Sequence, residues 1–262
     1  MFVPINIDLL LSAYAHGIFP MADSREDRES FWVEPQQRAI MPLDGFHVSK
    51  SLAKAIRQDR FEVSSDRDFA GVIRLCAEST DDRQETWINS DIEKAFLQLH
   101  QMGLAHSVEC WRDGRMVGGL YGLAMGKAFF GESMFSRATD ASKVAMAWLV
   151  ARMKLGGFVL LDCQFMTEHL QSLGAIEISQ KHYLELLEVA LVDLRDQVST
   201  VASPSPPDAS SSAGAAGAAA GALSAGADWG ALDRLLAESS FGFSTGVSSP
   251  GKFILHSLTQ TS

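Results

Sequence analysis

The chain has 262 residues, of which 47% are hydrophobic and 21% charged, as is ordinary for a soluble globular protein of one or two domains. It contains no apolar run of about 18 residues, which argues against a membrane-spanning helix, and its start lacks the basic and apolar segments of a secretory signal. A formal net charge of −10 excludes a uniformly basic nucleic-acid-binding protein, but not a local basic patch that contacts phosphates.

The three cysteines are scattered, and no Cys-x-x-Cys pair occurs. We therefore expect neither a disulfide framework nor a structural zinc site for Cys76, Cys110 and Cys163. The simplest interpretation is that they are buried small hydrophobic residues of a protein in the reducing cytoplasm.

Helical spacing of apolar residues predicts a first helix from Asp8 to His16, which Gly17 and Pro20 end. A charged surface loop follows at 23–30.

A second helix is predicted from the N-cap Ser49 to about Gln58. Lys50, Lys54 and Arg57 fall at i, i+4 and i+7, so one face of this helix presents all three cations. They form either a phosphate-binding patch or an ordinary solvated helix face.

A short strand at 61–64 and a helix at 68–78 come next. Ser90 with Glu93 has the capping-box pattern of a further helix, which extends to about residue 102 and is ended by Gly103. Asp113-Gly114 between the apolar runs 105–112 and 115–124 predicts a β-hairpin.

A third strand, Lys127 to Met134, extends the hairpin into a meander. We predict that Asp140 caps a long helix at 141–155 and that the apolar run 158–161 is a buried central strand. Shorter helices are expected at 167–173 and 182–191. Together these elements predict the α/β (α+β) class, with a mixed sheet flanked by helices.

Residues 203–227 are dominated by proline, serine, alanine and glycine, which is typical of a flexible linker. Beyond it, 229–236 has the pattern of a brief helix and 252–258 that of a short apolar element.

Two segments carry polar residues where apolar ones would be expected. Glu132 stands among aromatic residues and methionines in the third meander strand, where desolvation is costly unless the carboxyl group is paired or used. Asp162 and Gln164 follow the buried strand and, two apart, should point to the same side of it. Structural hydrogen bonds are the alternative interpretation for all three.

The chain also carries ordered motifs: Tyr14-x-x-Gly17-Ile18-Phe19-Pro20, Trp32 with Pro35 and Arg38, Thr86-Trp87-Ile88, Gly118-Gly119-Leu120-Tyr121-Gly122, Gly131 to Ser136 with Ala141-Ser142-Lys143, and Asp162-Cys163-Gln164 with His169 and Ser172 to Ala175. Each string is weak by itself. The ordered set is specific, and over roughly residues 5–190 it resembles the leucyl/phenylalanyl-tRNA–protein transferase family.

This resemblance implies an acetyltransferase-like (GNAT) fold with a small N-terminal domain. The expected organisation is a small domain at 1–40, a catalytic domain at 41–198, a linker at 199–228 and a C-terminal tail at 229–262 without a catalytic role. The family moves Leu, Phe or, less well, Met from aminoacyl-tRNA to proteins that begin with Arg or Lys, which marks them for N-degron degradation. The resemblance implies no metal and no coenzyme. We further expect a cytoplasmic protein that acts as a monomer and does not bind a membrane.

Site residues follow from the matching motifs. The resemblance implies Asp162 and Gln164 as the catalytic pair, with Glu132 beside them. The remaining assignments are the walls of an amino-acid pocket (Leu120, Phe129, Gly131, Met134), contacts to the terminal adenosine (Trp32, Trp87) and contacts to the tRNA (Lys50, Lys54, Arg57).

Three other functions remain as alternatives. An acyl-CoA N-acetyltransferase would need a Gln/Arg-x-x-Gly-x-Gly/Ala phosphate loop, and 115–120 departs from that pattern at its last position and lies inside a predicted strand. An aminoacyl-tRNA-dependent ligase for cell-wall precursors would share the donor. A non-catalytic tRNA-binding or N-degron-binding module would need no Asp162/Gln164 pair.

Overall fold

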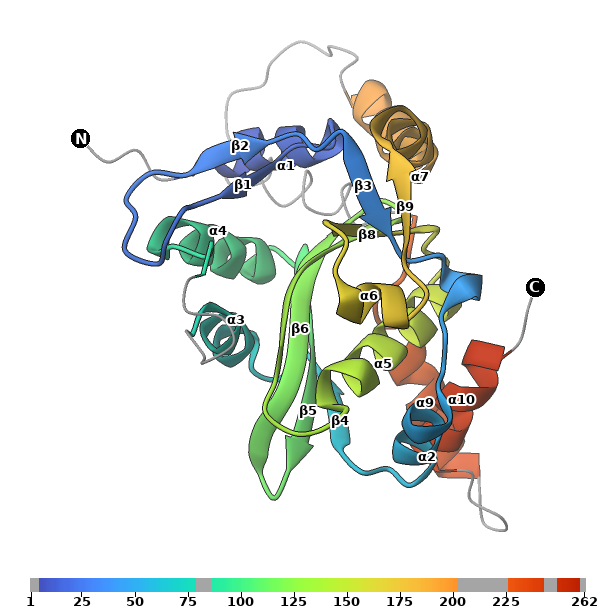
Figure 1. Cartoon of the computed structure of the whole chain (residues 1–262). Helices are drawn as coiled ribbons and strands as arrows, with labels where there is room; N and C mark the ends of the chain where they lie inside the picture. The colour runs from blue at the N-terminus through green and yellow to red at the C-terminus, as the bar shows by residue number, and fades with distance from the viewer. Residues whose placement is uncertain (1–4, 79–85, 202–225, 243–248, 260–262) are drawn as a thin grey trace, which may run out of the picture.

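The computed structural model describes residues 5–78, 86–201, 226–242 and 249–259 (Figure 1). Most of the predicted linker, at 202–225, therefore lies outside the described residues. None of the helices described is long and apolar enough to cross a membrane.

The N-terminal segment consists of a helix and a small hairpin. Helix α1 (Ile7–Ala15) agrees with the predicted helix, and its N-cap Asn6 accepts a hydrogen bond from the main-chain nitrogen of Leu9 at 2.9 Å. Strands β1 (Phe19–Met21) and β2 (Phe31–Val33) pair antiparallel, on either side of the predicted charged loop. The sequence pattern predicts neither strand, because three-residue strands contain too little alternation to detect.

The main sheet of the described residues has seven strands, in the order β4-β5-β6-β7-β8-β3-β9. Strands β4 to β7 form an antiparallel meander, β8 runs parallel to β7, and β3 pairs antiparallel with both β8 and β9. The bounds are β3 (Gln37–Ile40), β4 (Glu62–Ser65), β5 (Ala105–Arg112), β6 (Arg115–Met125), β7 (Ala128–Ser136), β8 (Leu160–Gln164) and β9 (Ile176–Ser179). The predicted mixed sheet with flanking helices is confirmed.

Two hydrophobic cores pack against this sheet, since successive strand residues point to opposite faces. Phe130 and Leu160 belong to one core, and their neighbours Phe129 and Leu161 belong to the other. The first core is covered by α1, α3 (Phe69–Ala77), α4 (Ser90–Gln101) and α7 (Gln180–Val201), and the second by α2 (Lys50–Arg57), α5 (Ala141–Leu155), α6 (Glu168–Ser172), α9 (Ala231–Gly242) and α10 (Pro250–Thr259) (Figure 1). A short 3-10 helix, η1 (Leu43–Gly45), precedes α2.

Two predicted helix caps are wrong in detail. Asn89, not Ser90, is the N-cap of α4, and its Oδ1 accepts hydrogen bonds from Asp91 N at 3.1 Å and Ile92 N at 2.9 Å. Asp140 does occupy the N-cap position of α5, but at a φ of 69° its side chain makes no capping bond. Its carboxylate pairs with Arg60 at 3.3 Å instead. In α4 the side chain of the preceding residue accepts the capping bonds, and at α5 the predicted cap pairs with an arginine instead of with the main chain.

The predicted buried strand at 158–161 is displaced along the chain. Val159 is 55% exposed, and β8 begins at Leu160 and continues through Asp162 and Cys163 to Gln164. The strand is central because it lies between β7 and β3, and all of its residues are buried. Pairing on both edges therefore extends the strand through Asp162 to Gln164, which the sequence pattern places after its end.

The C-terminal segment packs on the second core through Trp229. Its indole stacks on His106 and Phe129, with centroids 4.4 Å and 5.3 Å apart, and its Nε1 donates to Asp66 Oδ2 at 3.0 Å. Arg152, which is only 3% exposed, donates to both carboxylate oxygens of Asp233 on α9, at 2.6 Å and 2.7 Å. The predicted C-terminal tail thus covers part of the second core.

We expect Trp229→Ala to lower the free energy of unfolding by about 2–4 kcal/mol, because it removes a large half-buried aromatic contact and one hydrogen bond. Urea unfolding followed by circular dichroism measures this change. Leu9→Ala, at a side chain that is 57% exposed, is the control and should change stability by less than about 1 kcal/mol. Equal effects of the two variants would contradict an anchoring role for Trp229.

Candidate active site

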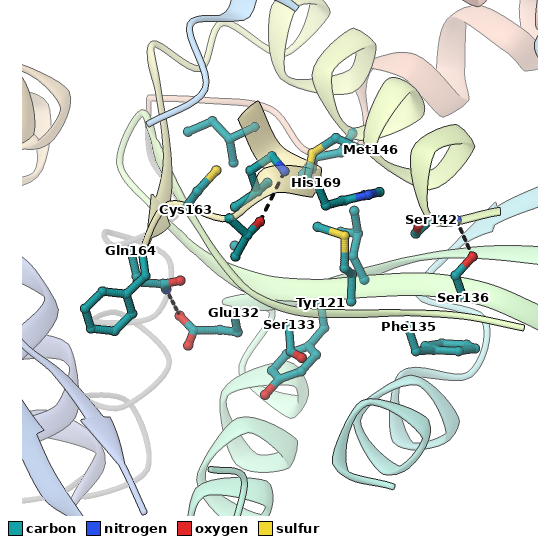
Figure 2. A pocket seen from close by; sticks show the side chains of 18 of the residues that line it. Tyr121, Glu132, Ser133, Phe135, Ser136, Ser142, Met146, Cys163, Gln164 and His169 are labelled. Carbon is teal, nitrogen blue, oxygen red and sulfur yellow. Dashed lines mark hydrogen bonds between the residues drawn. The ribbon is translucent and has the colours of Figure 1, made fainter. Parts of the chain in front are cut away.

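A largely apolar cavity of about 470 Å³ lies where β6, β7 and β8 meet α5 and α6. Its apolar lining includes Leu120, Met134, Met146, Leu149, Leu161 and Leu170. Figure 2 shows Gln164 and Glu132 at one end of the cavity and Ser136 with Ser142 at the other. The cavity can therefore hold an apolar group next to a small set of polar side chains.

A β-bulge places Glu132 in this cavity. In the β6–β7 ladder Tyr121 pairs with Ser133 and Gly122 with Gly131, so Glu132 is left opposite no residue. Gly122 permits the close approach, because a Cβ there would lie 2.2 Å from the carbonyl oxygen of Phe130. Bulges commonly re-aim a side chain beside an active site.

Glu132 is 8% exposed, and its carboxylate has two hydrogen-bond donors. The Tyr14 hydroxyl donates to its Oε1 at 2.8 Å, and Gln164 Nε2 donates to the same oxygen at 3.2 Å. Burial raises the pKa of Glu132 to about 8, with Asp162 adding to the increase, while the Tyr14 hydrogen bond opposes it. Such a carboxyl group changes its charge near physiological pH, which is a common property of functional sites.

Asp162 lies behind the cavity wall, fully buried in an ion pair with Arg38. Arg38 Nε and Nη2 donate to its two oxygens at 2.9 Å and 2.5 Å, and the Tyr183 hydroxyl donates at 2.8 Å. The Arg38 guanidinium, 1% exposed, lies over the rings of Phe19 and Tyr183 and also donates to the Gly17 carbonyl at 2.9 Å. The N-terminal segment therefore helps to hold this ion pair.

Asp162 reaches Gln164 through the main chain. Gln164 N donates to Asp162 Oδ1 at 2.8 Å, and Gln164 has a φ of 56°, in the left-handed region. The ladder with β3 is irregular at the same place, since Ala39 pairs with Gln164 and Ile40 with Asp162. The expectation that the two side chains point to one side of a regular strand is thus wrong, because the strand is bulged; the amide lines the cavity and the carboxylate does not.

The structure brings several of the other predicted site residues to the cavity. Leu120, Gly131, Met134 and Trp87 line it. Phe129, expected in the pocket wall, is not among the lining residues; it belongs to the same second core as the lining residues Leu120 and Leu161, but it stacks on Trp229 instead.

Trp32 and the basic helix face lie outside the cavity lining. Trp32 is on β2 and is 42% exposed. Lys50, Lys54 and Arg57 are exposed along α2, whose opposite side, with Leu52 and Ile56, is buried. The predicted common face of the three cations is confirmed, and its role stays a prediction.

Three residues without a predicted role, Tyr14, Arg38 and Tyr183, form hydrogen bonds from distant elements to the carboxylates of Glu132 and Asp162. Arg38 precedes the apolar run Ala39 to Met41, and a cation at the start of a buried strand could have indicated a buried partner. Tyr14 begins the first of the ordered motifs, which marked it without giving it a role, and Tyr183 lies in none of them. Ser142, Met146 and Leu149 were also missed, although their i, i+4, i+7 spacing puts them on one face of α5.

We expect Glu132→Gln to raise the melting temperature at pH 9 by about 5 °C or more, and to change it little at pH 5. The folded-state pKa of about 8 lies above the ordinary value of 4.5, so the folded protein binds more protons between these values and loses stability as the pH rises through them. The neutral amide avoids that loss. Calorimetry at both pH values measures it, and an equal difference at pH 5 and pH 9 would contradict the raised pKa.

The chain is similar in sequence to known proteins. The family model described as leucyl/phenylalanyl-tRNA protein transferase matches residues 40–188, and the model of that family's N-terminal domain matches residues 4–36. Among relatives named leucyl/phenylalanyl-tRNA–protein transferase, that of Zymomonas mobilis is 64% identical over 71% of this chain and 70% of its own length. That of Rhizorhabdus wittichii is 63% identical over 71% and 75%. That of Paramagnetospirillum magneticum is 56% identical over 76% and 96%.

Proposed function

The chain belongs to the leucyl/phenylalanyl-tRNA–protein transferase family, and on this basis we propose that it transfers Leu or Phe, and less well Met, from aminoacyl-tRNA to the α-amino group of proteins that begin with Arg or Lys. The product would then be degraded through the N-degron pathway. The observation that carries the proposal is the hydrogen-bonded pair of Glu132 and Gln164 at the end of the apolar cavity.

The apolar cavity suits the side chain of the donor amino acid. Methionine walls such as Met134 and Met146 adapt to leucine or phenylalanine, because unbranched thioether side chains repack easily. Discrimination between similar apolar side chains should be modest, since one methylene is worth about 1–3 kcal/mol. Trp87 in the same lining could stack on the terminal adenine, and we assign Trp32 to its outer edge.

The reaction requires little acid–base assistance. The ester that links the amino acid to tRNA is already activated, and a protein α-amine has a pKa of about 7.7–8.0, so part of it is neutral at physiological pH. The amine nitrogen attacks the ester carbon, the bond from that carbon to the ribose oxygen breaks, and the ribose hydroxyl leaves with a proton from the amine. Orientation of the reactants can contribute about 7–11 kcal/mol to such a step.

We assign the roles in this step to three residues. The Gln164 side-chain oxygen accepts a hydrogen bond from the attacking amine and directs its lone pair, since an amide is too weak a base to remove the proton. Asp162 holds Gln164 through its main-chain nitrogen, at 2.8 Å. Glu132 attracts the cationic nitrogen of the acceptor, which in turn favours the ionised carboxylate.

Two further assignments belong to this proposal. The antiparallel meander β4–β7, followed by α5 and the parallel strand β8, supports an acetyltransferase-like fold for the catalytic domain. The exposed cations Lys50, Lys54 and Arg57 on α2 are assigned to the phosphates of the tRNA.

One assay tests the proposed function. The protein is mixed with Leu-tRNA that carries radiolabelled leucine and with a peptide that begins with Arg, and a peptide with an acetylated N-terminus is the control. We expect label only on the free peptide. Absence of label on both peptides would overturn the proposal, and labelling by radiolabelled acetyl-CoA would favour an acetyltransferase instead.

A further inference from the structure

Tyr14 reaches the candidate site from outside the strands that carry it. It lies on α1, is fully buried, and donates its hydroxyl hydrogen to Glu132 Oε1 at 2.8 Å. Its ring packs edge-on against Phe130 and Phe96, with centroids 5.0 Å and 6.5 Å apart. These aromatic contacts fix the direction of the hydroxyl group, so Tyr14 holds the carboxylate from a rigid position.

Both donors to Glu132 bind the same oxygen. Gln164 Nε2 also donates to Oε1, at 3.2 Å, and within the described residues no hydrogen bond to Oε2 is found. The last torsion of a glutamate side chain is soft, so a carboxylate without such partners would rotate. The two bonds to Oε1 therefore leave Oε2 as the oxygen that a ligand in the cavity can bind.

We propose that Tyr14 is a positioning residue, which holds the Glu132 carboxylate so that Oε2 binds a cationic nitrogen of the acceptor substrate. This inference rests on the proposed function, since the acceptor is the N-terminus of a protein. A cationic nitrogen is the group that matches a single free carboxylate oxygen in a buried, partly apolar site. The N-terminal segment thereby contributes to acceptor binding.

The groups that face Glu132 come from three elements, α1, β3 and β8, and they act in opposite directions on its pKa. Burial raises the pKa most; the hydrogen bond from Tyr14 lowers it, the charge of Asp162 raises it, and Arg38 and the hydrogen bond from Gln164 lower it. Loss of the Tyr14 hydroxyl removes one of the contributions that favour the carboxylate. Glu132 should then ionise at a higher pH.

The test uses Tyr14→Phe, which removes only the hydroxyl group. We expect kcat/KM for an Arg-peptide to fall about tenfold at pH 7, with KM for Leu-tRNA unchanged, because a hydrogen bond to a charged group is lost. The midpoint of the pH profile should also move to higher pH. In a Glu132→Gln background the same substitution should have little further effect on either quantity.

The matched control is Leu10→Val, on the same helix and equally buried, which loosens the packing of α1 but keeps the hydroxyl. If Leu10→Val produces the same loss of activity and the same pH midpoint as Tyr14→Phe, the role of Tyr14 is only structural and the inference is overturned. An unaltered kcat/KM in Tyr14→Phe would overturn it as well.

A second readout separates this inference from the proposed function. Carbon-13 NMR of protein labelled at the glutamate carboxyl carbons follows the titration of Glu132, which is identified by its absence in Glu132→Gln. A higher titration midpoint in Tyr14→Phe than in the unaltered protein or Leu10→Val supports the positioning of the carboxylate even without turnover. An unaltered protein that transfers no leucine would refute the acceptor substrate, whereas an unchanged titration would refute the part played by Tyr14.

Discussion

Asp162→Ala should lower the turnover of leucine transfer by about a hundredfold or more, while the binding of aminoacyl-tRNA stays nearly intact. The carboxylate holds the main-chain nitrogen of Gln164 at 2.8 Å, and Gln164 has a left-handed φ of 56° that costs free energy without such support. A displacement of about 1 Å at a reacting group can cost about a hundredfold in rate. Single-turnover kinetics and filter binding measure the two quantities.

The same substitution should lower the free energy of unfolding by about 3–5 kcal/mol, because it leaves the guanidinium of Arg38 buried without its counter-ion. The double variant Arg38→Met with Asp162→Leu is the matched control, since apolar residues of similar volume can replace a buried ion pair at little cost. We expect it to regain stability but not turnover. Recovery of both would show that Asp162 only stabilises the fold, and equal loss of binding and turnover in Asp162→Ala would indicate misfolding.

Replacing Lys50, Lys54 and Arg57 together by glutamate should raise KM for aminoacyl-tRNA by about a hundredfold and change kcat little. The three side chains are exposed on one face of α2, so they can contact phosphates without taking part in the core. If each neutralises one phosphate, the slope of log affinity against log salt should become less steep by about two to three in the triple variant. Initial rates at several salt concentrations measure both effects.

The control for this charge reversal is Arg74→Glu, Arg115→Glu and Lys181→Glu, which changes the net charge equally at exposed positions on other elements. A comparable increase in KM in the control would mean that total charge, not this helix, determines tRNA binding. An unchanged KM in the variant of α2 would contradict the proposed tRNA contact.

Local sequence patterns predicted most elements of the fold. Asp113-Gly114 indicated the β5–β6 hairpin, and both residues have the positive φ that such a turn needs, 52° and 71°. Ser49 was predicted as the N-cap of α2, and its Oγ accepts from Leu52 N at 3.2 Å. These predictions hold because turn geometry and capping depend on residues within four positions of each other.

The candidate site could be predicted only in part. Glu132 and Gln164 were identified as unusual polar residues in apolar strands, and they are hydrogen-bonded at 3.2 Å in the structure. The strand alternation assumed for Asp162 failed, because the bulges in β7 and β8 depend on which residues the neighbouring strands pair with. Register is a property of two strands, and one strand's sequence does not contain it.

The amino-acid sequence by itself determined the fold class, the hairpin and most helices of this protein, and the polar residues around which a site could form. Only the tertiary structure decided that Tyr14 and Arg38, more than a hundred positions away in the chain, hold Glu132 and Asp162. The physical reason is that a buried polar group must find a partner wherever the packed chain supplies one, so its partner is set by the arrangement of whole elements. Local propensity acts over a few residues and cannot specify that choice.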